Sequence, residues 1–164
     1  MTIRPILTWP NDALRMTCAR VQNAGDVGEL AKDMLETMYD APGRGLAAPQ
    51  IGVDARLFVM DAAWKTGDPA PWVCINPTLH QIQDDIIPSE EGCLSLPNVT
   101  AVVQRSKTIR MDYTDLAGQR HDVILTGFEA LCAQHEVDHL DGVLIFDHLE
   151  DSARNTFFSD YGTA

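Results

Sequence analysis

The segment 134–139 reads Gln-His-Glu-Val-Asp-His, which places two imidazoles four residues apart with a carboxylate directly after the first. In an α-helix, residues four apart lie on one face, about 6 Å apart along the axis. His135 and His139 would then hold one metal ion between them. Glu136 is turned by about 100° from His135, so its carboxylate would flank the ion as a general base. The same pattern can arise by chance on a surface helix, so it needs support from elsewhere in the chain.

The residues around this segment favour a helix. Thr126 followed by Glu129 matches a capping box, and Gly142 shortly after Leu140 is a typical helix stop. We expect this helix to be the central one of the domain, packed against a sheet. The residues expected to anchor it there are Phe128, Leu131 and Ala133.

A catalytic metal site needs a third protein ligand and one open position. The chain after His139 does not supply a convincing one. Ile145 occupies the third-histidine position of the longer HExxHxxGxxH pattern, and His148 is out of register. Glu150 lies closer to the second histidine than a glutamate ligand usually does. The strongest candidate lies upstream at Cys93, because a thiolate is a strong ligand.

Cys132 is a second thiol that could be taken for a ligand. It precedes His135 by three residues and therefore shares its face of the helix. A ligand one turn below the two histidines would crowd the same side of the ion, so a place in the wall of a pocket is the better interpretation. The remaining cysteines, Cys18 and Cys74, have apolar neighbours and are predicted to be reduced core residues.

Asp138 lies about 60° round the helix from His135, so its position suits a supporting residue better than a ligand. We predict an ion pair between Asp138 and Arg105 that holds the helix against the strand following the cysteine segment. A solvated aspartate is the alternative.

Three segments together resemble the three ordered motifs of the peptide deformylases. They are GRGLAAPQ at 43–50, EGCLS at 91–95 and QHEVDH at 134–139. The similarity also covers 10–15, 75–77 and 105–146, and therefore most of the 164 residues. The resemblance implies a metal-dependent hydrolase that removes the formyl group from N-formylmethionyl peptides of newly made proteins and releases formate.

The resemblance also implies the metal and its ligands. Cys93, His135 and His139 would hold one divalent ion. Thiolate and imidazole suit Zn²⁺, but they also bind Fe²⁺, Co²⁺ and Ni²⁺. The family implies ferrous iron as the working ion, so we expect preparations made in air to lose activity.

Three more positions acquire a catalytic role through the resemblance. Glu136 would take a proton from water and later give it to the departing amine. Gln50, through its side-chain amide, and the backbone N–H of Leu94 would stabilise the negative charge that develops on the formyl oxygen. A loop glutamine bonded only to backbone is the alternative interpretation of Gln50.

Gly45 and the neighbouring backbone would bind the substrate peptide in an extended form, because a glycine lets two backbones approach closely. The methionine side chain of the substrate would enter an apolar pocket. Its wall is assigned, from positions on the metal-binding helix, to Phe128, Leu131 and Cys132. A flexible thioether suits such a pocket.

Arg44 departs from the family pattern, since the position between the first two glycines of that motif is apolar in typical members. Its guanidinium could narrow the peptide site, attract an acidic substrate residue or point to solvent. Thr100 replaces a larger basic or aromatic side chain, which could weaken the grip on the peptide backbone. Two alternatives to a deformylase therefore stay open: a related metallohydrolase with a shifted acyl-peptide specificity, and a non-catalytic paralogue.

The whole chain, with 164 residues of which 45% are apolar, is long enough for one buried core and too short for two ordinary domains. We therefore expect one catalytic domain over residues 1–164, acting as a monomer. The net charge of −12 argues against binding to nucleic acid or an anionic membrane surface. The sequence has no long apolar run and no export signal, so the protein is expected to be cytoplasmic.

Local patterns predict the remaining elements. A capping pattern at Asp26 and Glu29 starts a helix that is expected to end near Pro42, and the segment 43–50 reads as a loop. Strands are expected at 56–60, 72–75, 99–103, 107–113 and 121–125. Because strands and helices do not alternate regularly, we expect an α+β fold with mixed or antiparallel sheets around the metal-binding helix.

Overall fold

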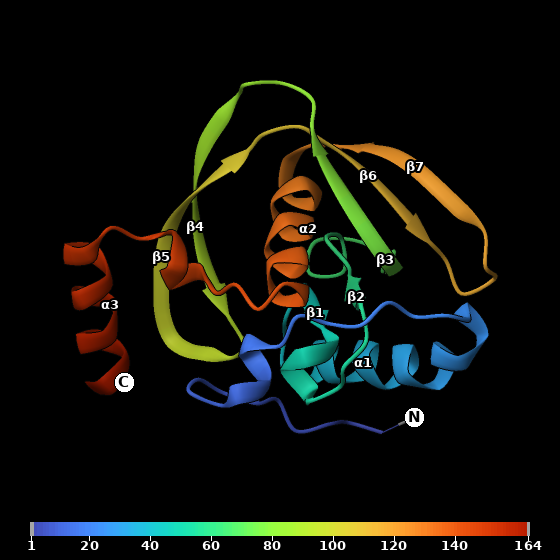
Figure 1. Ribbon diagram of the computed structural model, residues 1–164, viewed down its shortest axis with the longest axis horizontal. Coiled ribbons are helices and arrows are strands. Elements are labelled where there is room, and N and C mark those ends of the chain that lie inside the picture. Colours follow the sequence, from blue (N-terminus) through green and yellow to red (C-terminus); the bar gives the residue numbers. More distant parts are fainter. Residues whose placement is uncertain (1, 164) are drawn as a thin grey trace.

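The computed structural model describes residues 2–163, and these form two antiparallel sheets around a central helix (Figure 1). The larger sheet has the order β1-β2-β3-β6-β7. Its strands are β1 (Gly45–Ala47), β2 (Leu57–Met60), β3 (Trp72–Gln81), β6 (Ile109–Thr114) and β7 (Arg120–Leu125). The smaller sheet pairs β4 (Ile86–Cys93) with β5 (Leu96–Ser106). The predicted α+β class is confirmed.

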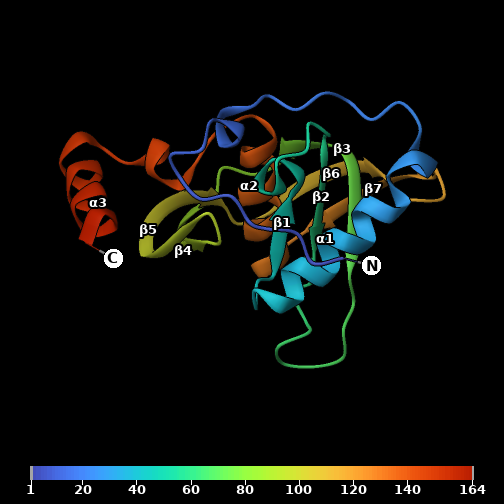
Figure 2. The same ribbon diagram turned by 90° about the horizontal axis from the view of Figure 1, so that it is seen from below.

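Three α-helices and four short 3₁₀ turns complete the described residues 2–163. The helices are α1 (Gly28–Asp40), α2 (Gly127–Leu140) and α3 (Asp151–Thr163). The turns are η1 (Asp12–Arg15), η2 (Ala24–Val27), η3 (Ala48–Ile51) and η4 (Ile145–His148). Helix α2 lies between the two sheets, α1 packs on β1 and β2, and α3 packs on β5 at the far end of the molecule (Figure 2). None of these helices is long and apolar enough to cross a membrane.

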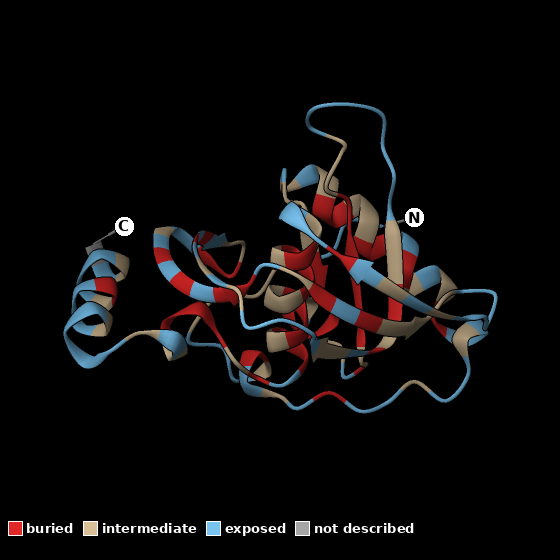
Figure 3. Ribbon diagram, turned by 90° about the horizontal axis from the view of Figure 1, so that it is seen from above, coloured by how far each residue is buried: buried red, intermediate tan, exposed pale blue. Residues whose placement is uncertain are grey.

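The main core lies between α2 and the five-stranded sheet. Small residues of α2, Ala130 and Ala133, are fully buried and let the helix approach the sheet closely. They pack against the side chains of Phe58, Met60 and Met111. Figure 3 shows the buried residues gathered on α2 and on the strands that face it. The segment 134–139 therefore lies on a helix whose sheet-facing side is covered.

The capping-box predictions for α1 and α2 are wrong, although Thr126 is the N-cap of α2 and Gly142 follows its end. Thr126 is the N-cap of α2, but its side chain makes no capping hydrogen bond, and Gly127 follows with a φ of 59°. A left-handed φ at the first residue of the helix removes the geometry that a capping box needs. Helix α1 is entered directly from the η2 turn, so Asp26 is not its cap, and Glu29 pairs with Lys32 instead.

Other boundaries differ in ways that matter for the site. The segment 43–50 is not a plain loop, because it contains β1 and η3. Strand β4 was not predicted, since its polar and glycine residues are poor strand formers and it forms through pairing with β5. The prediction that Phe128 anchors α2 in the core is also wrong, because 43% of its surface is exposed. It faces a cavity instead.

Candidate metal centre and peptide pocket

Three possible metal ligands from two elements converge beside α2. Cys93 ends β4, and His135 and His139 lie one turn apart on α2. Their ligand atoms all lie within 4.8 Å of one another. Cys93 Sγ lies 3.3 Å from His139 Nε2, and the two imidazole centroids are 5.0 Å apart. The structure thus brings together the three residues that the sequence singled out.

The chemistry of this group fits a divalent ion. A thiol and two imidazoles form a donor set of the kind that zinc and neighbouring transition metals accept. Burial first, and the neighbouring His135 second, lower the pKa of His139 well below its usual value. The pKa of His135 is shifted the other way: burial opposes the shift, but hydrogen bonds with Cys93 and Glu91 raise it well above its usual value.

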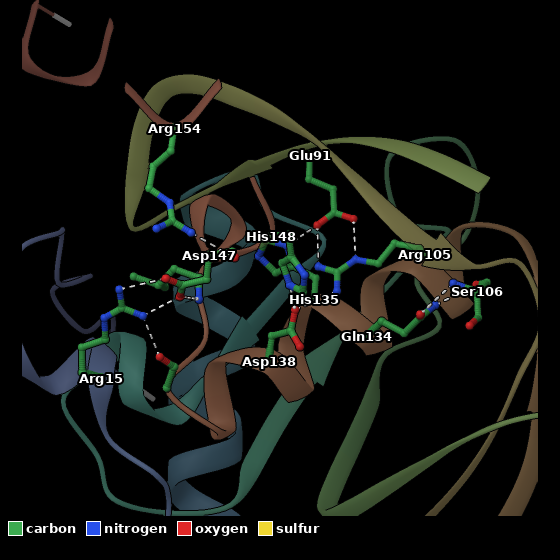
Figure 4. Close-up of polar contacts among 12 residues, drawn as sticks. Arg15, Glu91, Arg105, Ser106, Gln134, His135, Asp138, Asp147, His148 and Arg154 are labelled. Atoms are coloured by element: carbon green, nitrogen blue, oxygen red, sulfur yellow. Dashed lines mark hydrogen bonds and ion pairs between the residues drawn. The ribbon is translucent and has the colours of Figure 1, made fainter. Parts of the chain in front are cut away.

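A buried ion-pair cluster supports the first histidine (Figure 4). His135 Nδ1 lies 3.0 Å from Glu91 Oε1, so Nε2 is the ring nitrogen that would bind a metal ion. Arg105 donates to both oxygens of Glu91, at 2.9 and 2.8 Å, and to Asp138 Oδ2 at 2.7 Å. The predicted pair between Arg105 and Asp138 is confirmed. His148 shares the same Asp138 oxygen at 2.7 Å.

Glu91 belongs to the second motif, but no role of its own was predicted for it. Burial alone would raise the pKa of this carboxyl, yet hydrogen bonds from Arg105 and His135 lower it to about 2. The signal that could have found it is its spacing from Cys93. Residues two apart on a strand point to the same face, so a recognised β4 would have put both beside α2.

Glu136 lies on the pocket side of α2 and is buried. Its Oε2 has no hydrogen-bond partner among the side chains and backbone of residues 2–163. Burial is the main cause that raises the pKa of Glu136 to about 7. A carboxylate with one free oxygen and a pKa near neutrality is suited to moving a proton.

Gly45 makes room for this carboxylate. A Cβ on Gly45 would overlap Glu136 Oε1 and would lie 2.8 Å from Cys132 Sγ. Cys132 itself is buried and its thiol donates to the backbone oxygen of Arg44, so it lies in the pocket wall as predicted. The close approach of β1 to α2 therefore depends on a residue without a side chain.

Gln50 is held by both ends of its amide. Its Oε1 accepts from the backbone N–H of Ala47 at 2.9 Å, and its Nε2 donates to Ser95 Oγ at 3.1 Å. The same Nε2 lies 3.7 Å from Cys93 Sγ. Leu94 follows Cys93 at the turn between β4 and β5 and lines the same pocket. The amide N–H₂ of Gln50 thus faces the cysteine ligand candidate.

A cavity of about 920 Å³ opens over these groups. Its wall includes all five residues predicted to bind substrate, which are Arg44, Gly45, Phe128, Leu131 and Cys132. The Arg44 guanidinium carbon lies 4.9 Å from the centroid of the Phe128 ring. The Arg44 side chain therefore lies against the ring of Phe128 at the wall of the cavity. Thr100 also lines the cavity.

Comparison with known proteins gives consistent matches along the chain. Residues 3–155 match the family model described as polypeptide deformylase. The peptide deformylase of Agrobacterium fabrum is 42% identical over 165 residues, which cover 100% of this chain and 97% of that protein. The peptide deformylase of Afipia carboxidovorans is 44% identical over 165 residues, covering 100% of this chain and 96% of that protein.

Solved structures give the same result. A peptide deformylase from Legionella pneumophila superposes with a TM-score of 0.90 at 35% identity, covering 99% of this chain and 95% of that one. A peptide deformylase from Synechococcus elongatus, solved in complex with actinonin, gives a TM-score of 0.91 at 34% identity, covering 98% and 89%. Both the sequence and the fold are thus similar to those of peptide deformylases.

Proposed function

The chain belongs to the polypeptide deformylase family, and we propose that it removes the formyl group from N-formylmethionyl peptides of newly made proteins and releases formate. The observation that carries the proposal is the floor of the pocket. There a buried carboxylate with a free oxygen, Glu136, lies beside the group of Cys93, His135 and His139. This arrangement suits hydrolysis of a small carbonyl group.

The three-residue group would hold one divalent metal, as the family's metal dependence requires. When bound, such an ion supplies a Lewis acid that polarises the formyl carbonyl and activates water. Fe²⁺ is the proposed ion in the cell, and Zn²⁺, Ni²⁺ or Co²⁺ would fit the same thiolate and imidazole donors. Glu91 and Arg105 would keep His135 in the orientation that binding needs.

Glu136 is proposed as the group that moves the proton. Its free Oε2 takes a proton from the attacking water and later gives it to the amine nitrogen of the departing peptide. The carbon–nitrogen bond of the formamide then breaks, and formate and the free peptide amine leave. A pKa of about 7, raised mainly by burial, allows the carboxyl both steps near neutral pH.

Gln50 and Leu94 are proposed to stabilise charge on the formyl oxygen. The bond from Ala47 N–H to Gln50 Oε1 fixes the amide, so that Nε2 is aimed without reorganisation. The backbone N–H of Leu94 would be the second donor. Removal of one such donor typically raises the barrier by about 3 to 4 kcal/mol.

The peptide is proposed to bind along β1. This strand is at the edge of the five-stranded sheet, so one side of its backbone is not paired within that sheet. An extended peptide can add to such an edge by main-chain hydrogen bonds. The methionine side chain would then lie against Phe128, Leu131 and Cys132, which line the cavity on the α2 side.

We also propose that residues 1–164 act as one catalytic domain, as a cytoplasmic monomer, without binding nucleic acid or membranes. One family match over 3–155 and a core shared by α2 and the larger sheet support a single domain. The net charge of −12 opposes binding to anionic surfaces.

The test is formate release from formyl-Met-Ala-Ser by protein purified without oxygen and loaded with Fe²⁺. Glu136→Gln, loaded to the same metal content, is the control. We expect the wild type to release formate and the variant to be slower by at least about 100-fold. The proposal would be overturned if the metal-loaded wild type released no formate, or if Glu136→Gln released formate at the wild-type rate.

Arg44 is the observation that favours a second candidate function, a hydrolase with a shifted acyl-peptide specificity. Its charge lies in the wall assigned to the substrate side chain. Faster hydrolysis of another acylated peptide than of formyl-methionyl peptides would favour that alternative. A non-catalytic paralogue predicts instead that Glu136→Gln has no effect in the cell.

A further inference from the structure

Arg44 places a cation in a largely apolar wall of the pocket. Its backbone is fixed, because its carbonyl accepts from Asp61 N–H at 2.8 Å and from the Cys132 thiol at 3.7 Å. Its guanidinium lies over Phe128, and its buried Nε has no hydrogen-bond partner within residues 2–163. The guanidinium therefore lies against the first turn of α2, which carries Phe128.

Lys65 brings a second cation to the same pocket. Its Nζ lies 5.5 Å from the Trp64 ring centroid. Trp64 donates its indole N–H to the backbone oxygen of Gly43 at 2.8 Å. This bond ties the turn that carries Lys65 to the segment that carries Arg44.

The charge balance of the protein makes this pair of cations unusual. Although the net charge is −12, neither Arg44 nor Lys65 forms an ion pair with any carboxylate of residues 2–163. Most of the other arginine and lysine side chains form an ion pair with a carboxylate. They are Arg4, Arg15, Lys32, Arg56, Arg105, Arg110 and Arg120. Three acids also line this pocket. Glu91 is held by Arg105 and His135, Glu136 is buried beside the candidate metal group, and Glu90 accepts from the Thr100 hydroxyl at 3.3 Å. None of the three pairs with Arg44 or Lys65, so these two cations are available to a ligand.

We propose that Arg44, assisted by Lys65, selects formylated peptides that carry a carboxylate side chain at their third residue. The inference rests on the proposed deformylase function. In an extended peptide, residues one and three point to the same side, about 6.8 Å apart. When the methionine lies against the wall of Phe128, Leu131 and Cys132, the third side chain comes out on that side, where Arg44 can receive it.

The test compares two formylated peptides of the same shape, formyl-Met-Ala-Asp-Ala and formyl-Met-Ala-Asn-Ala, both amidated at the C-terminus. The readout is the ratio of their kcat/KM values for formate release. We expect the wild type to favour the aspartate peptide by about three- to tenfold at low ionic strength, and salt to reduce the ratio. In Arg44→Gln the ratio should fall to about 1, and in Lys65→Gln it should fall by less.

Arg20→Gln is the matched control, because Arg20 is an exposed cation that does not line the pocket. It should keep the wild-type ratio. Thermal unfolding of each variant checks that the fold is retained. A ratio near 1 in a wild type that hydrolyses both peptides, or a preference that survives Arg44→Gln, overturns the inference and leaves the deformylase function standing.

Failure of the function itself would look different, since neither peptide would release formate. The question is then decided by calorimetric binding of the unformylated peptides Met-Ala-Asp-Ala and Met-Ala-Asn-Ala. Tighter binding of the aspartate peptide that is lost in Arg44→Gln supports the inference. Equal binding of the two peptides overturns it.

Discussion

Two arginines tie the chain together around α2, and they do so in different surroundings (Figure 4). Arg105 is only 4% exposed and holds Glu91 and Asp138 behind His135. Arg15 is 39% exposed and holds Asp147 and the backbone oxygen of Gly142, just past the end of α2. Both make several short hydrogen bonds. The two clusters differ in whether water can solvate a carboxylate once its arginine is removed.

In the exposed cluster, water can solvate a carboxylate that loses its arginine, so the pair adds little stability. In the buried cluster it cannot, so a lost partner leaves an uncompensated charge. The buried cluster also touches a candidate ligand, whereas the exposed one does not. Similar contacts should therefore have different consequences, for stability and for the metal.

The largest effect is expected from Arg105→Met. It leaves the Glu91 carboxylate buried without its main partner, so the free energy of unfolding should fall by about 3 to 5 kcal/mol. Metal content should fall as well, because Glu91 would no longer be held against His135. Urea unfolding and metal analysis of the purified protein measure the two effects.

The double variant Glu91→Gln with Arg105→Met is the control for that experiment. It removes the unpaired charge, so part of the stability should return while metal affinity stays low. If Arg105→Met changes neither the unfolding midpoint nor the metal content, the buried cluster has no special role and the comparison fails.

A smaller loss is expected from Gly142→Ala, on the exposed side. Gly142 has a φ of 72°, and a Cβ there would lie 2.5 Å from the backbone oxygen of Arg15. We expect a loss of about 1 to 3 kcal/mol, because an alanine is strained at this φ and the contact cannot relax easily. Gly28→Ala, with no atom within 4 Å of its Cβ, is the matched control and should change stability little. Equal unfolding midpoints for the two variants would refute this.

Arg15→Gln should cost less, at about 1 kcal/mol or below. The salt bridge to Asp147 is partly solvated, and the remaining contribution comes from packing of the guanidinium over Trp9 and Phe146. Metal content should not change. A loss as large as that of Arg105→Met would break the distinction between the two clusters.

The smallest effect is a dependence on pH in the exposed cluster. Burial raises the pKa of Asp147, but hydrogen bonds from Arg15 and the Leu144 N–H outweigh this and lower the pKa below its usual 3.8. The unfolded chain therefore binds this proton more readily, so the stabilisation is present above about pH 4 and is lost as pH falls through the folded pKa. The stability difference between wild type and Arg15→Gln should stay constant from about pH 7 to 5 and shrink below about pH 4. A difference that grows on acidification would contradict this sign.

The sequence predicts the parts of the site that depend on local periodicity. Helical spacing puts His135 and His139 on one face and Asp138 beside them, so the helix and the pair with Arg105 follow directly. Three ordered motifs also bring Cys93 and Gln50 to the same place. Only the third motif lies on one regular element, α2; Cys93 and Gln50 were placed by the resemblance to the family motifs.

What the sequence does not predict depends on long-range packing. Strand β4 exists because it pairs with β5, and its own residues favour no strand, so the position of Glu91 behind His135 could not be read. The positive φ of Gly127 likewise spoils a capping pattern that looks sound in the sequence. Phe128 was predicted both to anchor α2 and to line the substrate pocket; the exposed ring lines the pocket, and only the anchoring role is wrong.

The proposed hydrolysis depends on one ion bound by Cys93, His135 and His139. The most direct test is the absorption spectrum of protein loaded without oxygen with one equivalent of Co²⁺, for the wild type, Cys93→Ser and Cys132→Ser. We predict a thiolate-to-cobalt band in the near ultraviolet for the wild type and Cys132→Ser, and its loss in Cys93→Ser. A band that survives in Cys93→Ser, or that disappears only in Cys132→Ser, would contradict the proposed centre.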